Sequence, residues 1–425
     1  MADMPLPSPK ATGEVSEDMR ADEQLMETLE DAAYWRKVCP HLHVGEHERV
    51  QEAAQAAKER VANWQTQAET KRGEFAENGF FHMTPQDLGL GEDDYLERIH
   101  ALALGVVRLM QHGWPASFIF IYDEAWILVA GASARLEAAT GGSGFIGDMY
   151  AWYVEPDHGQ RGWGPHRDRM GSGPESFRAD GTSKLSTTWL ALTDAGPNNS
   201  CLYVVPATAD PLFHKADRQD VDPLAEIFAN DPQAYQSIRA LPAPAGCAWH
   251  FSHRIIHWGS HVARRSSLGP ARPPQPRIAM SWVVGDAAYE DPAFPREANL
   301  PSPPVHLRVA FVAGQIVAYG GQTKLRKGFR TMCFRFFKKH SQLFTEFYRD
   351  KVEFIHFCRP APAPEVHLKE SSRKALETVD VSKLEFATPQ DDSKLDGIKG
   401  MFGSDSSSED EDDNDDDDEE EEDNM

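Results

Sequence analysis

The sequence has little cysteine and lacks the signals of export and of membrane insertion. It contains five cysteines in 425 residues, at Cys39, Cys201, Cys247, Cys333 and Cys358. An odd, scattered set predicts free thiols in a reducing compartment rather than a disulfide framework. No apolar run approaches the length that crosses a bilayer, and no basic region followed by an apolar core opens the chain. We therefore expect a cytoplasmic or nuclear protein without a transmembrane segment.

Basic residues are also scarce, at 43 Lys and Arg against 67 Asp and Glu. Much of this excess lies in a low-complexity acidic run that extends from Asp405 to Asp423. Such a run cannot bury a core, so we expect 360–425 to be a disordered linker and acidic tail. Its charge disfavours direct binding to nucleic acid. One hypothesis is that the tail binds a basic protein partner and that Ser406 to Ser408 are phosphorylated.

Five residues have the order expected for one iron site: His166, Arg167 and Asp168 in sequence, followed by His257 and Arg277. Two imidazoles and one carboxylate on one face of a metal select non-heme Fe(II) and leave positions open for a co-substrate and dioxygen. A keto-acid bound there would need a cation for its far carboxylate, and the guanidinium of Arg277 matches a carboxylate bidentately. His-x-Asp triplets are expected by chance in this composition, so the surrounding sequence decides their weight.

The residues around this motif are typical of short antiparallel strands separated by Gly, Pro and Asn turns. The expected strands cover 149–155, 185–192, 201–206, 244–251, 255–260 and 277–284. Four histidines compete for the third ligand position: His250, His253, His257 and His261. Residues two apart share a strand face, so His257 points the same way as Ile255. We favour His257, with His253 as the alternative.

Four segments together resemble the phytanoyl-CoA dioxygenase family of iron- and 2-oxoglutarate-dependent oxygenases. They are GPHRD, TTWLALTDAGPNNSCLYVVP, PAGCAWHFSHRIIHWGS and RIAMSW, within roughly 115–290. The resemblance implies a mainly β protein with α elaborations: a double-stranded β-helix, or jelly roll, flanked by N- and C-terminal helices.

The resemblance also implies Fe(II) as the metal, with 2-oxoglutarate and O2 as co-substrates. His166, Asp168 and His257 would be the metal ligands, and Arg277 would lie deeper, on the next strand. Trp189 matches a tryptophan that lines the co-substrate pocket of the family. The carboxylate of Asp168 leaves no vacancy for a halide, which favours hydroxylation of a small-molecule or acyl substrate, with release of succinate and CO2.

The chain departs from the family pattern in its loops. Asn199-Ser200 stands where the family usually has Asn-Gly, Pro206 to Ala209 replaces Pro-Gly-Ser-His, and 263–276 resembles an insertion. The C-terminus also lacks a peroxisomal Ser-Lys-Leu address, which weakens an acyl-CoA substrate. Two other functions stay open: a catalytically silent jelly-roll scaffold acting through the acidic tail, and a cupin-like metal protein that would not use Arg277.

The rest of the chain predicts helices around this core. We expect a disordered N-terminus at 1–16, a helical region at 17–115 that braces the barrel, the catalytic core at 116–290 and a C-terminal helical extension at 291–359. Apolar residues at helical spacing favour helices near 50–64 and 95–110, and an acidic start predicts one over 123–139. An aromatic amphipathic stretch at 334–354 is expected to pack on the barrel or on a second subunit.

A second cluster of metal-binding residue types lies near the N-terminus. It consists of Cys39, His41, His43 and His47. Thiolate and imidazole ligands suit zinc, but zinc sites usually draw on two separated pairs of ligands. The same spacing fits an ordinary extended segment between helices, which we consider the better interpretation.

Overall fold

The computed structural model describes residues 19–88, 92–155, 162–169, 172–216, 222–228, 232–259, 275–295, 302–319 and 327–358. All of these lie in the first of two compact units, Met1–Ala387. The expected disordered N-terminus at 1–16, His261, most of the insertion at 263–276 and the acidic tail at 360–425 lie outside the described residues.

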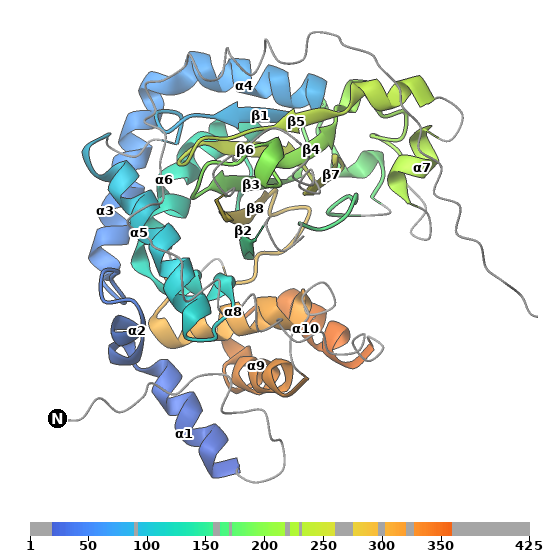
Figure 1. Cartoon of the computed structure of the whole chain (residues 1–425). Coiled ribbons are helices and arrows are strands. Elements are labelled where there is room, and N and C mark those ends of the chain that lie inside the picture. Colours follow the sequence, from blue (N-terminus) through green and yellow to red (C-terminus); the bar gives the residue numbers. More distant parts are fainter. Residues whose placement is uncertain are drawn as a thin grey trace, which may run out of the picture. The chain divides into compact units, whose positions relative to one another are not determined.

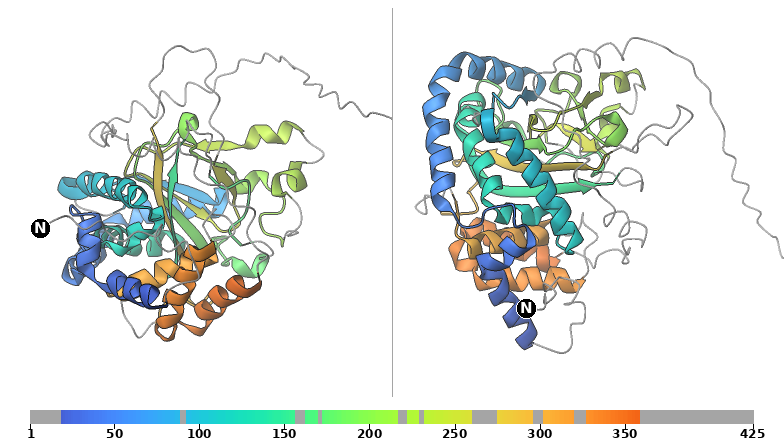
Figure 2. Two further views of the ribbon diagram at one scale, coloured as in Figure 1. Left: turned by 60° about the horizontal axis from the view of Figure 1, so that its bottom comes forward. Right: turned by 60° about the vertical axis from the view of Figure 1, so that its left-hand side comes forward.

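The N-terminal helices lie to the left of the strands and above them in Figure 1, and α4 lies near strand β1 (Figure 1, Figure 2). They are α1 (Met19–Glu30), α2 (Ala32–Val38), α3 (His47–Val61), α4 (Gln65–Asn78), α5 (Glu92–Gln111) and α6 (Asp123–Thr140). The helices expected near 50–64, 95–110 and 123–139 are therefore confirmed. Asp123 does not cap its own helix. Its carboxylate instead accepts backbone hydrogen bonds from Gly45 and Glu46, which fasten the loop before α3 to α6.

The strands form two antiparallel sheets. The larger has the order β1 (Phe80–Met83), β6 (Ala248–Ser252), β3 (Leu185–Ala191), β8 (Arg277–Gly285) and β2 (Gly144–Val154). The smaller has the order β5 (Arg239–Leu241), β4 (Leu202–Val205) and β7 (Ile256–Gly259). Every strand pair is antiparallel, as the turn-separated pattern predicted.

Two expectations about secondary structure are not met. Helices hold more of the described residues than strands do, so β-structure does not predominate. The region at 17–115 also contributes strand β1, which pairs with β6 from Phe80 opposite Phe251 to Met83 opposite Ala248. Gly79 allows the chain to turn from α4 into β1. It ends α4 with φ +80, a left-handed conformation that glycine adopts without a Cβ penalty. The domain boundaries remain predictions.

The two sheets share a hydrophobic cluster. Side chains of Trp189 on β3, Leu202 on β4 and Phe251 on β6 all belong to it. A larger cluster joins the sheet to the helices. The apolar residues of β3 therefore serve two cores: Leu190 packs in the helical cluster, whereas Trp189 and Ala191 pack in the cluster shared by the sheets. This explains why β3 is buried along its whole length.

The C-terminal extension contains α8 (Val305–Ala318), α9 (Lys327–Lys339) and α10 (Glu346–Cys358). The aromatic stretch expected at 334–354 is thus two helices, interrupted at Ser341–Leu343. Its buried rings, among them Phe337 and Tyr348, pack against α8 rather than directly on the sheets; Gly314 lets both approach closely. A fully buried ion pair between Arg308 and Asp123 ties α8 to α6. In the described part of the chain, no helix is both long and apolar enough for a membrane span.

Candidate metal centre

A pocket of about 140 Å³ lies where the two sheets meet the loop at 162–169. His166, Asp168 and His257 line it together with Arg277 and Trp189, so one cavity holds every site residue that the sequence predicted. The strands that contribute to it are β2, β3, β4, β6, β7 and β8. The pocket is therefore built mainly on rigid sheet positions, which is where precise constellations are best held.

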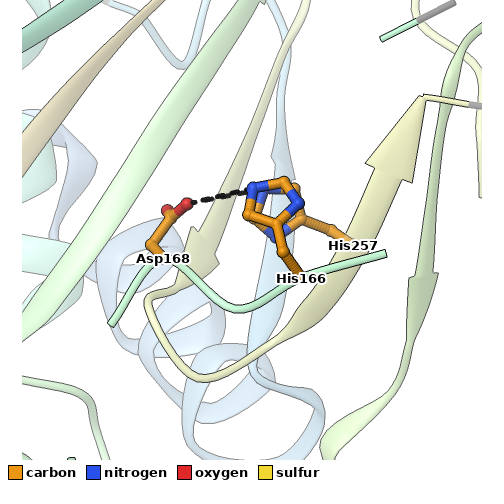
Figure 3. A group of neighbouring side chains, drawn as sticks. All are labelled: His166, Asp168 and His257. Carbon is orange, nitrogen blue, oxygen red and sulfur yellow. Dashed lines mark ion pairs between the residues drawn. The ribbon is translucent and has the colours of Figure 1, made fainter. Parts of the chain in front are cut away.

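The three expected metal ligands converge. Potential ligand atoms of His166, Asp168 and His257 all lie within 4.8 Å of one another. Oδ1 of Asp168 is 3.6 Å from Nε2 of His166 and 3.7 Å from Nε2 of His257. Figure 3 shows the two imidazole rings side by side, facing the carboxylate. Ligand atoms of a bound metal lie about 3 Å apart, because metal bonds are near 2 Å long. The observed separations are wider, so binding would draw the ligands together slightly.

Backbone pairing produces this convergence. His166 and His257 form an isolated antiparallel bridge: the amide of each donates to the carbonyl of the other, at 3.1 and 3.0 Å. The amide of Asp168 donates to the carbonyl of His253 at 3.0 Å. The loop carrying the His-x-Asp triplet is thereby bound to the segment that carries the third ligand. The motif therefore has a backbone frame as well as the right side chains.

The orientation of both rings favours coordination through Nε2. Nδ1 of His166 lies 2.7 Å from the carbonyl of Gly164, and Nδ1 of His257 lies 3.2 Å from that of Ile255. A carbonyl can only accept, so Nδ1 carries the proton and Nε2 keeps its lone pair. Nε2 of His166 is buried and has no hydrogen-bond partner among the described residues. Backbone acceptors behind histidine ligands are a usual feature of metal sites.

Charges in the triad perturb one another. Burial lowers the pKa of His166, but its interaction with the carboxylate of Asp168, 3.6 Å from Nε2, outweighs burial and raises that pKa above its ordinary value. Burial and the nearby His166 lower the pKa of His257 to about 4. Burial opposes ionisation of Asp168, yet the charges of His257 and His166 hold its pKa well below the usual range. A divalent cation would compete with the proton for His166, so acid should weaken its binding.

The alternative histidines occupy other environments. His253 places Nδ1 near Ser183 Oγ and the carbonyl of Leu185, at 2.6 and 2.8 Å, and is not part of the convergent group. His250 pairs Nδ1 with Thr188 Oγ1 and packs against Phe81. Both have pKa values lowered to about 3, with burial as the main cause. The structure thus assembles the triad with His257, which the sequence favoured, rather than with His253.

Arg277 is a buried cation at the same pocket. Its side chain is 1% exposed, and Nη1 donates to the carbonyl of Ser200 at 2.7 Å. Its Nε has no hydrogen-bond partner, and no carboxylate among the described residues forms an ion pair with it. Burial lowers the pKa of Arg277 to about 10. A guanidinium buried without an anion is costly, so the position calls for an anion from outside the described protein.

Two tryptophans flank this guanidinium. Its Cζ lies 5.7 Å from the ring centre of Trp189 and 5.8 Å from that of Trp152. Cation–π contacts of this kind partly compensate a desolvated charge. Trp189, expected from the sequence at the co-substrate pocket, lines the pocket beside Arg277.

The sequence did not predict several other lining residues. An aromatic wall of Tyr150, Trp163 and Tyr319 adjoins His166, with Trp163 stacked on Tyr319 at 5.4 Å and 5.6 Å from the His166 ring. Asp148 and Arg169 are joined by a 2.8 Å ion pair in the same lining. For Arg169, the one sequence feature that indicated a place in the pocket was its position directly after Asp168. Tyr319 lies just after α8, far from the motif in sequence, and gave none.

The N-terminal cysteine and histidine cluster does not form a metal site. Cys39 Sγ donates to the carbonyl of Gly105, and His41 Nε2 lies 3.0 Å from that of Ala101. His43 contacts Glu124, and His47 contacts Ser302, so the four side chains point to four different partners. Burial raises the pKa of Cys39 to about 11, which opposes the thiolate that zinc requires. The four side chains thus do not converge on one position in the structure.

Solved structures with some likeness to this chain include two enzymes of nogalamycin biosynthesis. The epimerase SnoN, crystallised with Fe3+, alpha ketoglutarate and nogalamycin RO, is 17% identical, with a TM-score of 0.38 over 52% of this chain and 84% of its own. The alpha ketoglutarate dependent carbocyclase SnoK is 18% identical, with a TM-score of 0.38 over 55% of this chain and 91% of its own.

A third similar structure is EctD from S. alaskensis with 2-oxoglutarate and 5-hydroxyectoine. It is 14% identical, with a TM-score of 0.34 over 55% of this chain and 81% of its own. No protein-family model matches the sequence, and no curated protein does. At these identities and TM-scores the likenesses carry no argument about the chemistry of this chain, which rests on its own residues.

Proposed function

We propose that this protein is an Fe(II)- and 2-oxoglutarate-dependent dioxygenase that hydroxylates a small-molecule substrate, with O2 as second co-substrate and succinate and CO2 as products. One observation carries the proposal. A single pocket holds a convergent triad of two imidazoles and a carboxylate together with a buried arginine that has no anionic partner among the described residues. A simple metal-binding protein has no use for that arginine. A keto-acid with a second carboxylate uses both features.

The residues fit this metal. The donor set is the one that selects non-heme Fe(II) with open coordination positions. Nε2 of His166 is buried with no hydrogen-bond partner among the residues that the structure describes, and the backbone acceptors at Nδ1 fix both imidazoles in the tautomer that a metal needs. His166, Asp168 and His257 would hold the ion. When bound, it would supply the oxidising chemistry that no side chain can perform.

The side chains of the pocket would position the co-substrate and the substrate and would exclude water. Arg277, which lies between Trp189 and Trp152, would neutralise and orient the far carboxylate of 2-oxoglutarate. Thr187 Oγ1 donates to Oδ2 of Asp168, which leaves Oδ1 directed toward the histidines. The aromatic wall of Tyr150, Trp163 and Tyr319 lies on the His166 side of the pocket and would receive the substrate while limiting access of water.

The proposed assignment extends to fold and family. We propose that the two sheets are the faces of a double-stranded β-helix and that the chain belongs with the phytanoyl-CoA dioxygenase family. Support comes from the antiparallel pairing of both sheets, the hydrophobic cluster that they share and the placement of Arg277 at the start of β8. The scaffold alternative depends on the acidic tail, which lies outside the described residues.

The test is anaerobic reconstitution with Fe(II) and 2-oxoglutarate. We expect a weak charge-transfer absorption band in the visible from the wild-type protein and none from His166→Ala or His257→Ala. His253→Ala is the matched control, because it removes a neighbouring imidazole outside the triad; circular dichroism should verify its folding. Absence of the band in the wild type would refute the proposed function. Loss in His253→Ala but not in His257→Ala would refute the ligand assignment alone.

A further inference from the structure

Ser200 occupies an unusual position beside Arg277. Its φ of +69 makes it the one non-glycine residue with positive φ in the described part of the chain. The left-handed region is sparsely populated by serine and costs on the order of 1 kcal/mol, whereas glycine adopts it freely. The turn holds it there: Asn199 bonds the amide of Gly196 and the carbonyl of Asp194. A glycine would satisfy the backbone better, so the side chain needs an explanation.

The hydroxyl of Ser200 is buried and unpartnered. The residue is 0% exposed, and Oγ has no hydrogen-bond partner among the described residues. Leaving such a group unsatisfied costs about 1–3 kcal/mol. Ser200 therefore has two unfavourable features, strain and an unpaired hydroxyl, with no compensating contact within the described protein. Outliers of this kind concentrate at functional sites.

The surroundings of Ser200 connect it to the pocket. Its carbonyl accepts the Nη1 hydrogen bond of Arg277. A Cβ placed on Gly259, which lines the pocket, would lie 3.3 Å from Ser200 Oγ. A Cβ placed on Gly162, also in the lining, would lie 3.2 Å from Nη2 of Arg277. The hydroxyl and the guanidinium thus both lie at the close contact between Gly162 and Gly259, two residues that line the pocket.

We propose that Ser200 Oγ is a second donor to the distal carboxylate of 2-oxoglutarate, beside Arg277. The proposal rests on the proposed function and names a further binding residue at that site. The buried hydroxyl and Nε of Arg277 are unpaired donors at this end of the pocket in the described structure, as is Nε1 of Trp152, and a carboxylate accepts from more than one direction. Ser200 adopts an unfavourable positive φ, but it places a hydroxyl at a position where glycine would provide no side chain.

Two variants separate the hydroxyl from the strain. Ser200→Gly removes both, and Ser200→Ala removes only the hydroxyl. Binding is measured by anaerobic titration of the Fe(II)-loaded protein with 2-oxoglutarate and, in parallel, with 2-oxobutyrate, which lacks the distal carboxylate. Both variants should bind 2-oxoglutarate about 10-fold more weakly, the loss expected for a hydrogen bond to a charged group. Their affinity for 2-oxobutyrate should equal that of the wild type. Ser200→Gly should also raise Tm, whereas Ser200→Ala should not.

Other results would overturn the assignment. If Ser200→Gly is more stable and binds 2-oxoglutarate as the wild type does, the serine has no binding role. If only one of the two variants loses affinity, turn geometry rather than the hydroxyl is responsible. A wild type that binds 2-oxoglutarate no more tightly than 2-oxobutyrate, unchanged by Arg277→Ala, would refute the anion pocket of the proposed function and, with it, the role of Ser200.

Discussion

Thr187 donates a hydrogen bond of 2.6 Å from Oγ1 to Oδ2 of Asp168. This contact links strand β3 to the metal-binding loop and fixes which carboxylate oxygen faces the two histidines. We predict that Thr187→Val, which keeps the shape but removes the donor, weakens Fe(II) binding roughly 10- to 100-fold, as loss of outer contacts typically does. Fluorescence or absorbance titration with Fe(II) or Co(II) under anaerobic conditions measures this directly.

Thr187→Ser is the matched control for this prediction. It keeps the hydroxyl and removes a methyl, so metal affinity should stay near that of the wild type. If Thr187→Ser loses as much affinity as Thr187→Val, packing of the methyl on β3 and not the hydrogen bond determines the geometry of Asp168.

Trp189 should act on the co-substrate and not on the metal. Its ring lies 5.7 Å from the guanidinium carbon of Arg277 and is 3% exposed. Trp189→Leu removes the cation–π contact, so we predict a loss of 2-oxoglutarate affinity of roughly 2- to 30-fold, from about 0.5–2 kcal/mol. Fe(II) affinity should be unchanged. Trp189→Phe retains an aromatic face, so its 2-oxoglutarate affinity should lie between those of the wild type and Trp189→Leu. Equal affinity in all three proteins would contradict this role.

The site could be predicted from sequence only where the chemistry is local to strands. His166, Asp168 and His257 follow from a spaced motif between short strands, and Arg277 follows from the next strand. Nothing local indicated Tyr319 or the pairing partners of Asp148. Helix α8 brings Tyr319 to the pocket by packing on β2, where the Gln315 side chain bonds the amide of Met149 and the carbonyl of Gly147. Such contacts depend on tertiary packing between distant segments.

The fold was predictable to a similar depth. Antiparallel strands followed from turns and β-branched residues, but strand β1 was hidden in a region of helical pattern. Four residues, Phe80 to Met83, are too few to show a clear period, and their pairing with β6 is non-local. The helices flanking the core were expected, but the fold was still described as mainly β because the family resemblance covers the sheets and not the helices on either side of them.

His250 should make the protein acid-sensitive. Burial lowers its pKa to about 3, against about 6.5 in an unfolded chain. Between these pH values the unfolded state binds more protons than the folded state. The contribution of neutral His250 to the free energy of unfolding is therefore complete above pH 6.5 and decreases as pH falls toward 3. We predict that His250→Asn, which can keep the bond to Thr188 Oγ1 but cannot be protonated, flattens this dependence by up to about 1.4 kcal/mol per pH unit.

Urea unfolding of the metal-free protein between pH 4 and 8 tests this. His250→Asn should be less stable than the wild type at pH 8, because the smaller side chain leaves space between Phe75 and Phe81. The difference in unfolding free energy between the wild type and His250→Asn should become smaller as pH decreases. A difference that stays constant with pH would mean that His250 does not contribute to the acid sensitivity.

Asp148 should stabilise the fold through its ion pairs with Arg169 and Lys351. It is 3% exposed and accepts charged hydrogen bonds from Arg169 Nη2 at 2.8 Å and from Lys351 Nζ at 2.8 Å. Burial opposes its ionisation, but Lys351 and Arg169 hold its pKa well below the usual range. We predict that Asp148→Asn destabilises the protein by about 3 kcal/mol, because it removes the charged hydrogen bonds to the partly buried Arg169 and Lys351, of which only Arg169 keeps a second carboxylate, Glu290. Lys351→Met should cost less, because Arg169 still neutralises the carboxylate.

The pH dependence separates this charge effect from a loss of packing. A depressed carboxyl pKa contributes stability above the unfolded pKa of about 3.9 and loses it only as pH falls through the folded value. The difference in unfolding free energy between wild type and Asp148→Asn should therefore be constant from pH 5 to pH 7 and shrink below pH 4. Lys351 lies on α10 and Asp148 on β2, so Lys351→Met should also lower the protection of α10 amides in hydrogen exchange. Unchanged exchange in α10 would show that apolar packing on α8, and not this ion pair, holds the C-terminal helix against the site.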